Sequence, residues 1–336
     1  MSLSPQLQTR LVRYAELRPC TNAFIDARSP GSDKKENFTI IGPGVAENPA
    51  QYVHIREPHG FNIGGARQPP GCTNSIHSHH SEEVFIVHSG TWRFFWGEHG
   101  DAGEVNLAPG DTISIPINVF RGFENIGDSV GFMFAVLGGD DPGRVHWAPQ
   151  VIINALAHGL VLLENGSLID TTLGESVPKG ATVVHPSTRK EIAYIRTPST
   201  EEMTGNVVRL AALRGNPDAL LATSGVREAA VIGAERSADG FAASPISTPH
   251  GFTLQHMTLD ARARTSLHAR DCVEVLLIHR GRLTWHNDGG DSIELNAGDT
   301  FTVPPGMPRA IEAITAAEIF VVRGGNDPGP VRIQPT

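Results

Sequence analysis

The sequence contains 336 residues, of which 36 are glycine and 24 are proline, and this composition is typical of a protein with many turns rather than long helices. Its formal net charge of −9 and its lack of any long run of lysine and arginine exclude the basic surface that nucleic acids or anionic membranes would require. No apolar stretch approaches the ~18 residues needed to cross a bilayer, and the first residues lack the pattern of a secretion signal. The three cysteines are scattered, which suits a reducing compartment. We therefore expect a cytoplasmic protein whose partner is a small molecule.

The first part of the chain, residues 1–49, is expected to form an N-terminal extension. Within it, residues 1–18 place Leu7, Leu11 and Tyr14 at a helical spacing, which predicts an amphipathic helix. Short helices of this kind would be additions to a fold that is otherwise built of strands.

Three short segments occur twice, in the same order and at nearly constant spacing. The pairs are 83–90 with 274–281, 107–112 with 295–300, and 138–143 with 324–329. Within each copy, short β-rich runs are separated by Gly, Pro, Asn or Asp every eight to twelve residues or so, which is typical of a β-sandwich or small barrel. The sequence therefore predicts an all-β protein with duplicated domains at residues 50–145 and 240–336, joined by a connecting segment at 146–239.

The clearest chemical motif lies between Gly71 and Gly90. His77 and His79 are two residues apart, so on a strand their side chains share one face. Glu83 follows after a short turn that can return its carboxylate to the same interior. Two imidazoles and one carboxylate with open positions suit a divalent first-row metal ion. The alternative is that these are surface residues of a polar turn, but that alternative leaves the spacing unexplained.

The fixed positions from Gly71 to Gly90 resemble the first motif of the cupin family at every point. The second cupin motif resembles Gly, five residues, Pro, any residue, Gly, two residues, His, three residues, Asn. Here Gly110, Pro116 and Asn125 match, whereas Asn118 replaces the Gly and Arg121 replaces the His. Because arginine has no lone pair to donate, Arg121 cannot be the fourth ligand.

Two interpretations of the altered first site stay open. In one, Arg121 points into the barrel and binds an anionic substrate group, or pairs with Glu83 as a structural residue. In the other, His80 compensates for the lost ligand, although strand alternation should turn its side chain away from that of His79.

The second copy retains less of the ligand set. His268 and Glu274 hold the places of the first His and the Glu, while Arg270 and Arg309 hold the places of the other two His residues. Two guanidinium groups around one carboxylate indicate a charge-paired cluster rather than a metal site. A second anion-binding site is the alternative.

The resemblance implies two cupin barrels, that is, double-stranded β-helices of the jelly-roll type, with one metal ion in the first barrel. Two-barrel members of the family include enzymes similar to gentisate and quercetin dioxygenases and others similar to oxalate decarboxylase. We expect a metal-dependent dioxygenase acting on a small aromatic or carboxylated compound, with Fe(II) as the first candidate metal and Mn, Ni, Co or Zn as alternatives. A non-oxidative decarboxylase, isomerase or hydrolase, or a non-catalytic ligand-binding or structural protein, is the alternative. The sequence is also compatible with a homo-oligomer.

Overall fold

The computed structural model describes residues 3–233 and 243–334, and these form two compact units. The first unit comprises Arg18–Arg56 and Asn62–Val207, and the second comprises Met1–Leu17, Glu57–Phe61 and Val208–Thr336. Strands dominate both units, as the sequence predicts. None of the helices in the described part of the chain is long and apolar enough to cross a membrane.

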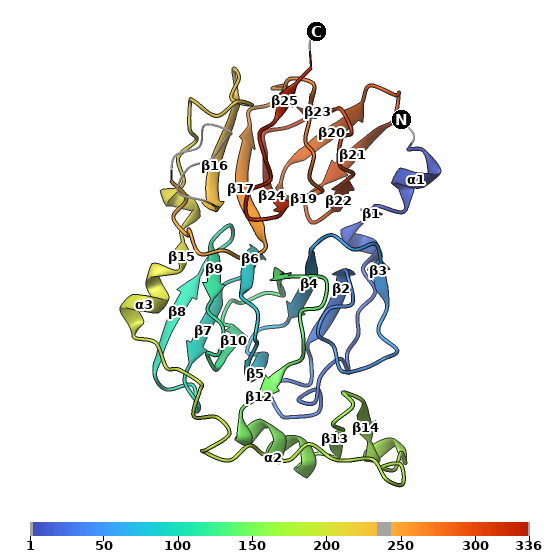
Figure 1. Cartoon of the computed structure of the whole chain (residues 1–336), viewed down its shortest axis with the longest axis vertical. Coiled ribbons are helices and arrows are strands. Elements are labelled where there is room, and N and C mark those ends of the chain that lie inside the picture. The colour runs from blue at the N-terminus through green and yellow to red at the C-terminus, as the bar shows by residue number, and fades with distance from the viewer. Residues whose placement is uncertain (1–2, 234–242, 335–336) are drawn as a thin grey trace. The chain divides into compact units, whose positions relative to one another are not determined.

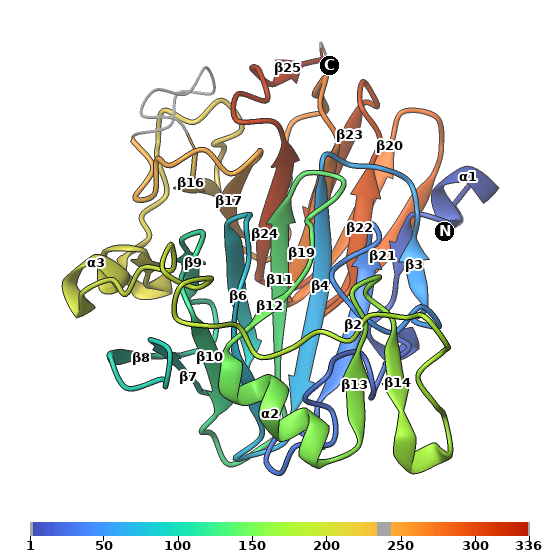
Figure 2. The same ribbon diagram turned by 60° about the horizontal axis from the view of Figure 1, so that its bottom comes forward.

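The first unit contains two sheets that form a barrel. One sheet has the strand order β15-β9-β6-β11-β4-β2-β3 and the other has the order β12-β5-β10-β7-β8. Its strands are β2 (Glu36–Ile41), β3 (Val53–Ile55), β4 (Phe61–Gln68), β5 (Thr73–Ser78), β6 (Glu83–Ser89), β7 (Trp92–Trp96), β8 (Gly103–Leu107), β9 (Thr112–Ile115), β10 (Arg121–Asn125), β11 (Gly131–Gly138), β12 (His146–Trp147) and β15 (Val207–Val208). Figure 2 shows β6, β11, β4 and β2 side by side in the larger sheet.

The core of this barrel lies between its sheets. Trp92, Phe94 and Trp96 alternate along β7, and none of the three is exposed to solvent. They pack with the apolar side chains of β6, β9 and β10, including Phe85 and Phe123. The alternation arises because successive side chains of a strand point to opposite faces.

A small layer of helix and hairpin covers one end of the first unit (Figure 1). The helix α2 (Pro149–Ala157) begins with proline at its first position, where the missing amide hydrogen is not needed. The strands β13 (Leu160–Leu162) and β14 (Leu168–Asp170) follow as a hairpin. Two short helices, η2 (Thr171–Leu173) and α3 (Thr200–Gly205), complete the unit.

The second unit repeats the arrangement with sheets in the orders β1-β22-β19-β24-β17-β16 and β21-β20-β23-β18-β25. Its elements are α1 (Pro5–Gln8), β1 (Leu11–Val12), η1 (Tyr14–Glu16), η3 (Leu210–Ala212), β16 (Val226–Ile232), β17 (Phe252–Leu259), β18 (His268–Ala269), β19 (Glu274–Arg280), β20 (Arg282–Asn287), β21 (Ser292–Asn296), β22 (Thr300–Val303), β23 (Arg309–Ala313), β24 (Ala317–Gly324) and β25 (Arg332–Ile333). Strands β6 and β19 are equivalent, and both lead into a glycine with positive φ, Gly90 and Gly281. A Cβ atom at Gly90 would lie 2.7 Å from Cα of Gly131, and one at Gly281 would lie 2.1 Å from the carbonyl oxygen of Ala316, so no larger residue fits.

The N-terminal 49 residues supply strands to both units. The strand β2 joins the larger sheet of the first unit, where it pairs with β3 and β4, and β1 pairs with β22 in the second. The amphipathic helix predicted over residues 1–18 is therefore wrong beyond its first turn. A helix this short is marginal on its own, and Leu11 and Val12 instead gain the hydrogen bonds of a sheet edge.

Candidate metal centre

Strands β5 and β6 bring three potential metal ligands together. His77 lies near the end of β5, His79 follows that strand directly, and Glu83 is the first residue of β6. All three are buried, and their ligand atoms lie within 4.8 Å of one another. The Nε2 atom of His79 is 3.9 Å from Oε1 of Glu83. Within residues 3–233 and 243–334, no other group of three His, Cys, Asp or Glu side chains converges in this way.

The surroundings of both histidines favour the neutral imidazole. Burial, with Arg121 as the next cause, lowers the pKa of His77 and of His79 well below the ordinary value. The Nδ1 atom of His77 lies 2.7 Å from the carbonyl oxygen of Ser75. Because a carbonyl oxygen only accepts, Nδ1 carries the hydrogen and donates a hydrogen bond to this oxygen. The lone pair of His77 is then on Nε2, which is the state required of a metal ligand.

The three side chains fit a divalent metal ion. Nitrogen and oxygen ligands lie ~2.0–2.2 Å from such an ion, which places neighbouring ligand atoms ~3–4 Å apart. Donor atoms within 4.8 Å of one another need only small side-chain rotations to reach that spacing. Two imidazoles and a carboxylate suit Fe, Mn, Co, Ni or Zn.

Arg121, on β10, lies directly against this group and is almost fully buried. Its Nη2 group donates a hydrogen bond to Oε2 of Glu83, and its Nη1 group donates to the carbonyl oxygen of His77 at 2.7 Å. Burial raises the pKa of Glu83, and the Arg121 guanidinium opposes that rise. Glu83 is one of the partners expected for Arg121 from the sequence, and in the structure the two side chains form an ion pair. Binding of a substrate anion by Arg121 stays a prediction, and Arg121 does not itself line the cavity described below.

Two neighbouring residues lie outside the group. His80 is exposed, and its Nδ1 atom lies 3.2 Å from Oδ1 of Asn118, so its ring faces away from His79. Glu124, which alternation turns away from Arg121, accepts a hydrogen bond from Arg93 at 2.6 Å.

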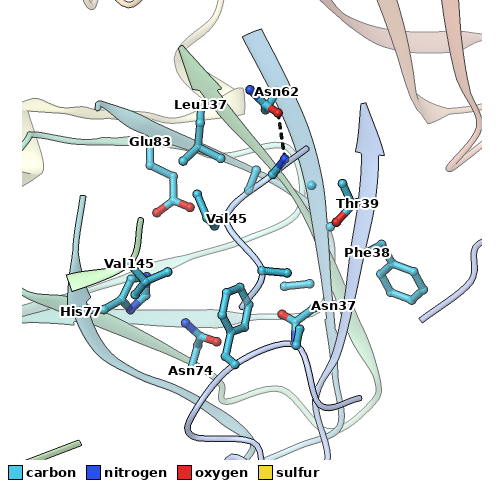
Figure 3. Close-up of a pocket in the computed structure, with 18 of the residues that line it drawn as sticks. Asn37, Phe38, Thr39, Val45, Asn62, Asn74, His77, Glu83, Leu137 and Val145 are labelled. Atoms are coloured by element: carbon cyan, nitrogen blue, oxygen red, sulfur yellow. Dashed lines mark hydrogen bonds between the residues drawn. The ribbon is translucent and has the colours of Figure 1, made fainter. Parts of the chain in front are cut away.

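Two of the candidate ligands, His77 and Glu83, lie at one side of a cavity of about 80 Å³ inside the first unit (Figure 3), and His79 also lines it. Most of its wall is apolar, with Phe85, Phe123, Leu137 and Val145 among the lining residues. The segment before β4 also contributes to the wall, with Phe24, Asn37, Phe38, Thr39, Val45 and Ala46. Reasoning from the sequence missed this contribution, although the aromatic and β-branched residues Phe38–Ile41 in β2 are typical of a strand.

Asn74 is another polar residue of the cavity wall that the sequence motif does not reveal. A bulge in the pairing of β5 with β10 shifts the register between His77 and Asn74, so that both line the cavity despite their odd spacing. Oδ1 of Asn74 accepts a hydrogen bond from Nζ of Lys35 at 3.0 Å, and this buried lysine also pairs with the buried Asp26. Because an ammonium group only donates, it fixes the amide oxygen and leaves the amide NH₂ of Asn74 to donate elsewhere.

In the second unit the equivalent residues form a buried charged cluster. Arg309 pairs with one oxygen of Glu274, and Nε of Arg270 lies 3.2 Å from the other. The pKa of Arg309 falls to about 9, mainly because of burial and then because of the neighbouring arginines. His268, also buried, shares this interior and has a pKa well below the ordinary value.

Two members of this cluster were missed from the sequence. Arg323 on β24 lies 2.8 Å from Glu274 and 3.0 Å from Glu228 on β16. These residues fall outside the duplicated ligand motif, and only the pairing of β17 with both β16 and β24 brings their strands together.

The two barrels, one with a His-His-Glu group that fits a metal ion, define a class of two-domain β-barrel proteins with one candidate metal centre. The sequence model of the Cupin domain family matches residues 66–137 and 255–323, once in each unit. The chain therefore contains two cupin domains and is a bicupin, as its motifs predict.

Comparison with solved structures agrees with this fold. Oxalate decarboxylase from Lactobacillus farciminis, in a formate complex, has a TM-score of 0.57 at 10% identity, covering 96% of this chain and 88% of that chain. Oxalate decarboxylase from Bacillus subtilis, studied for its Mn(II) centres, has a TM-score of 0.54 at 13% identity, with 96% and 79% covered. Vicilin from Corylus avellana (hazelnut) has a TM-score of 0.53 at 13% identity, with 97% and 88% covered. No curated protein sequence matches the chain at a significant level.

Proposed function

We propose that the protein is a metal-dependent enzyme that acts on a small carboxylated compound without net oxidation, as a decarboxylase does. The observation that carries this proposal is the convergence of His77, His79 and Glu83 at the side of a small cavity that also presents the amide of Asn74. The neutral imidazoles and the carboxylate suit a divalent cation, and a cation and an amide donor together suit an anionic group.

The chemistry of such a site follows from its parts. A divalent ion bound there would attract carboxylate oxygens and stabilise negative charge on them. The NH₂ group of Asn74, oriented by Lys35, would donate a hydrogen bond to a carboxylate oxygen beside His77. The apolar walls, including Phe85 and Leu137, would exclude water from the bound group. Exclusion of water strengthens both interactions because charges interact more strongly at low dielectric.

The size of the cavity favours a carboxylate over an aromatic ring at the metal. An engineered apolar cavity of ~150 Å³ holds one benzene molecule. The cavity beside His77 measures about 80 Å³, roughly half of that value. A head group of a few heavy atoms fits such a space.

The solved neighbours support the choice of reaction class and metal for a first test. Two of them are oxalate decarboxylases, one in complex with formate and one with Mn(II) centres. Their identity to this chain is only 10–13%, so the argument for activity rests on the residues of the cavity. We infer that Mn(II) should be tested before Fe(II).

A dioxygenase is the second candidate. Arg121 stands where the cupin motif has its last histidine, and the remaining two-His-one-carboxylate set is the arrangement found in non-haem Fe(II) oxygenases. This candidate predicts Fe(II) rather than Mn(II), and it predicts consumption of dioxygen in proportion to substrate.

One experiment separates the two candidates. Protein reconstituted separately with Mn(II) and Fe(II) would be supplied with oxalate, malonate and 2-keto acids, while CO₂ release and O₂ uptake are recorded together. We expect metal-dependent CO₂ release without net O₂ uptake, and no release from the His77→Ala variant. Stoichiometric O₂ uptake would instead establish the dioxygenase. Failure to bind either metal would reject both candidates.

A further inference from the structure

The cavity beside His77 has a larger neighbour in the same unit. This outer chamber has a volume of about 380 Å³, against about 80 Å³ for the inner cavity. Five residues line both spaces: Gly44, Val45, Ala46, Val145 and Trp147. The two spaces are therefore separated by a single layer of side chains.

Part of this shared wall is held rigidly. The indole NH of Trp147 donates a hydrogen bond to Oε1 of Glu47 at 2.6 Å, and the Trp147 ring packs 5.3 Å from that of His77. The backbone NH of Gly44 donates to Oδ1 of Asn62 at 2.9 Å, which fixes the loop that carries Val45 (Figure 3). Besides Trp147, this layer contains the smaller apolar side chains of Val45, Ala46 and Val145.

The outer chamber has an apolar side and a polar side. Ile152, Leu162, Leu163 and Val184 form the apolar side, and the charged residues Glu47, Arg144 and Glu164 also line the chamber. His146 also lines the chamber, where its Nδ1 atom lies 2.7 Å from the Tyr194 hydroxyl and its Nε2 atom lies 3.3 Å from Oγ of Ser187. Chambers of roughly 300 Å³ or more, mostly apolar with a few placed polar groups, are typical of sites for small organic ligands.

We infer that the substrate is a carboxylate with an aryl or alkyl tail, its head in the inner cavity and its tail in the outer chamber, with Val45 and Val145 forming the neck between them. This inference rests on the proposed function, since the metal centre must bind the carboxylate. It narrows the proposed substrates from small carboxylated compounds in general to those with an apolar tail, because a bare dicarboxylate would leave the outer chamber unused.

The test compares acetate with phenylacetate and 3-phenylpropionate as probes on the full-length protein loaded with Mn(II), using isothermal titration calorimetry. We expect an aryl compound to bind about ten- to a hundredfold more tightly than acetate, the range expected for burial of a phenyl group. Val184→Trp, which fills the outer chamber, should remove this gain and leave acetate affinity unchanged. Val177→Trp, the same substitution at an exposed position outside both linings, should retain the gain.

Ser187→Trp provides a second way to fill the chamber if Val184→Trp does not fold, and metal content is measured for each variant. Acetate binding without any gain from the aryl tail would overturn this inference and leave the proposed function intact. A gain that persists in both filled variants would overturn it as well. If neither acetate nor the aryl compounds bind to the Mn(II)-loaded protein, the proposed function fails, and this inference fails with it.

Discussion

Arg121 donates a hydrogen bond to Oε2 of Glu83, while Oε1 of the same carboxylate lies 3.9 Å from Nε2 of His79. One oxygen of Glu83 is thus engaged by a guanidinium, and the other remains for a metal ion. Because arginine does not lose its proton, it favours the ionised form of a carboxyl group whose pKa burial raises. The residue that replaces the last histidine of the cupin motif therefore orients the carboxylate of Glu83.

Replacing Arg121 by Met leaves Glu83 buried without its cationic partner. We expect the free energy of unfolding of the metal-free protein to fall by about 3–5 kcal/mol, the range for breaking a buried ion pair. The loss should be smaller in the metal-loaded protein, because the metal ion compensates the carboxylate. Urea unfolding with and without Mn(II) measures both values.

The matched control for this variant is Arg93→Met, which breaks an ion pair with Glu124 nearer the surface. It should cost at most about 1 kcal/mol in either state. An equal cost for the two substitutions would contradict the role given to Arg121. Loss of metal from Arg121→Met at neutral pH would also contradict it.

The number of metal ions per chain distinguishes the two barrels. We expect one, held by His77, His79 and Glu83, because the positive charge of Arg270 and Arg309 opposes a cation in the second barrel. Elemental analysis should show that His77→Ala removes the metal and that His268→Ala does not. Two metal ions per chain would falsify this assignment.

Asn74 should affect substrate binding without affecting the metal. In Asn74→Asp, the new carboxylate can still accept the hydrogen bond of Lys35, but it presents negative charge to a bound anion. We expect acetate to bind at least about tenfold more weakly, in line with the loss of a charge-assisted hydrogen bond, while metal content is unchanged. Calorimetry and elemental analysis provide the two readouts, and undiminished acetate affinity would exclude this role.

The raised pKa of Glu47 predicts that the stability of the protein depends on pH. Burial is the main cause that raises its pKa from 4.5 to about 8. Since the folded protein holds this proton more tightly than the unfolded chain, the associated stability is fully present below about pH 4.5 and is lost as the pH rises to about 8. In Glu47→Gln this loss is absent, so from pH 5 to 8.5 the variant should gain about 3–4 kcal/mol relative to the wild type. Urea unfolding across this range measures the gain.

Glu191→Gln is the control for that series. The Glu191 carboxyl is exposed and its pKa is lowered by hydrogen bonds from Thr188, so it is already ionised at pH 5. Its replacement should leave the slope of stability between pH 5 and 8.5 unchanged. If Glu47→Gln gave the same slope as the wild type, Glu47 would be ionised throughout this range.

The sequence by itself determined the features that depend on neighbouring residues. The duplicated segments indicate two barrels, and the spacing of His77 and His79 on one strand, with Glu83 after a short turn, predicts their convergence. These follow from the period of a strand and the reach of a turn, which are local properties of the chain.

Only the tertiary structure decided which distant residues surround that motif. The bulge opposite β10 turns Asn74 into the cavity, and Lys35, 39 residues earlier, orients its amide. Residues before β4 supply much of the cavity wall, and Arg323 reaches Glu274 through a strand outside the ligand motif. Such contacts depend on the pairing of strands far apart in sequence and on a single shift of register, and a one-residue shift reverses which face a side chain occupies.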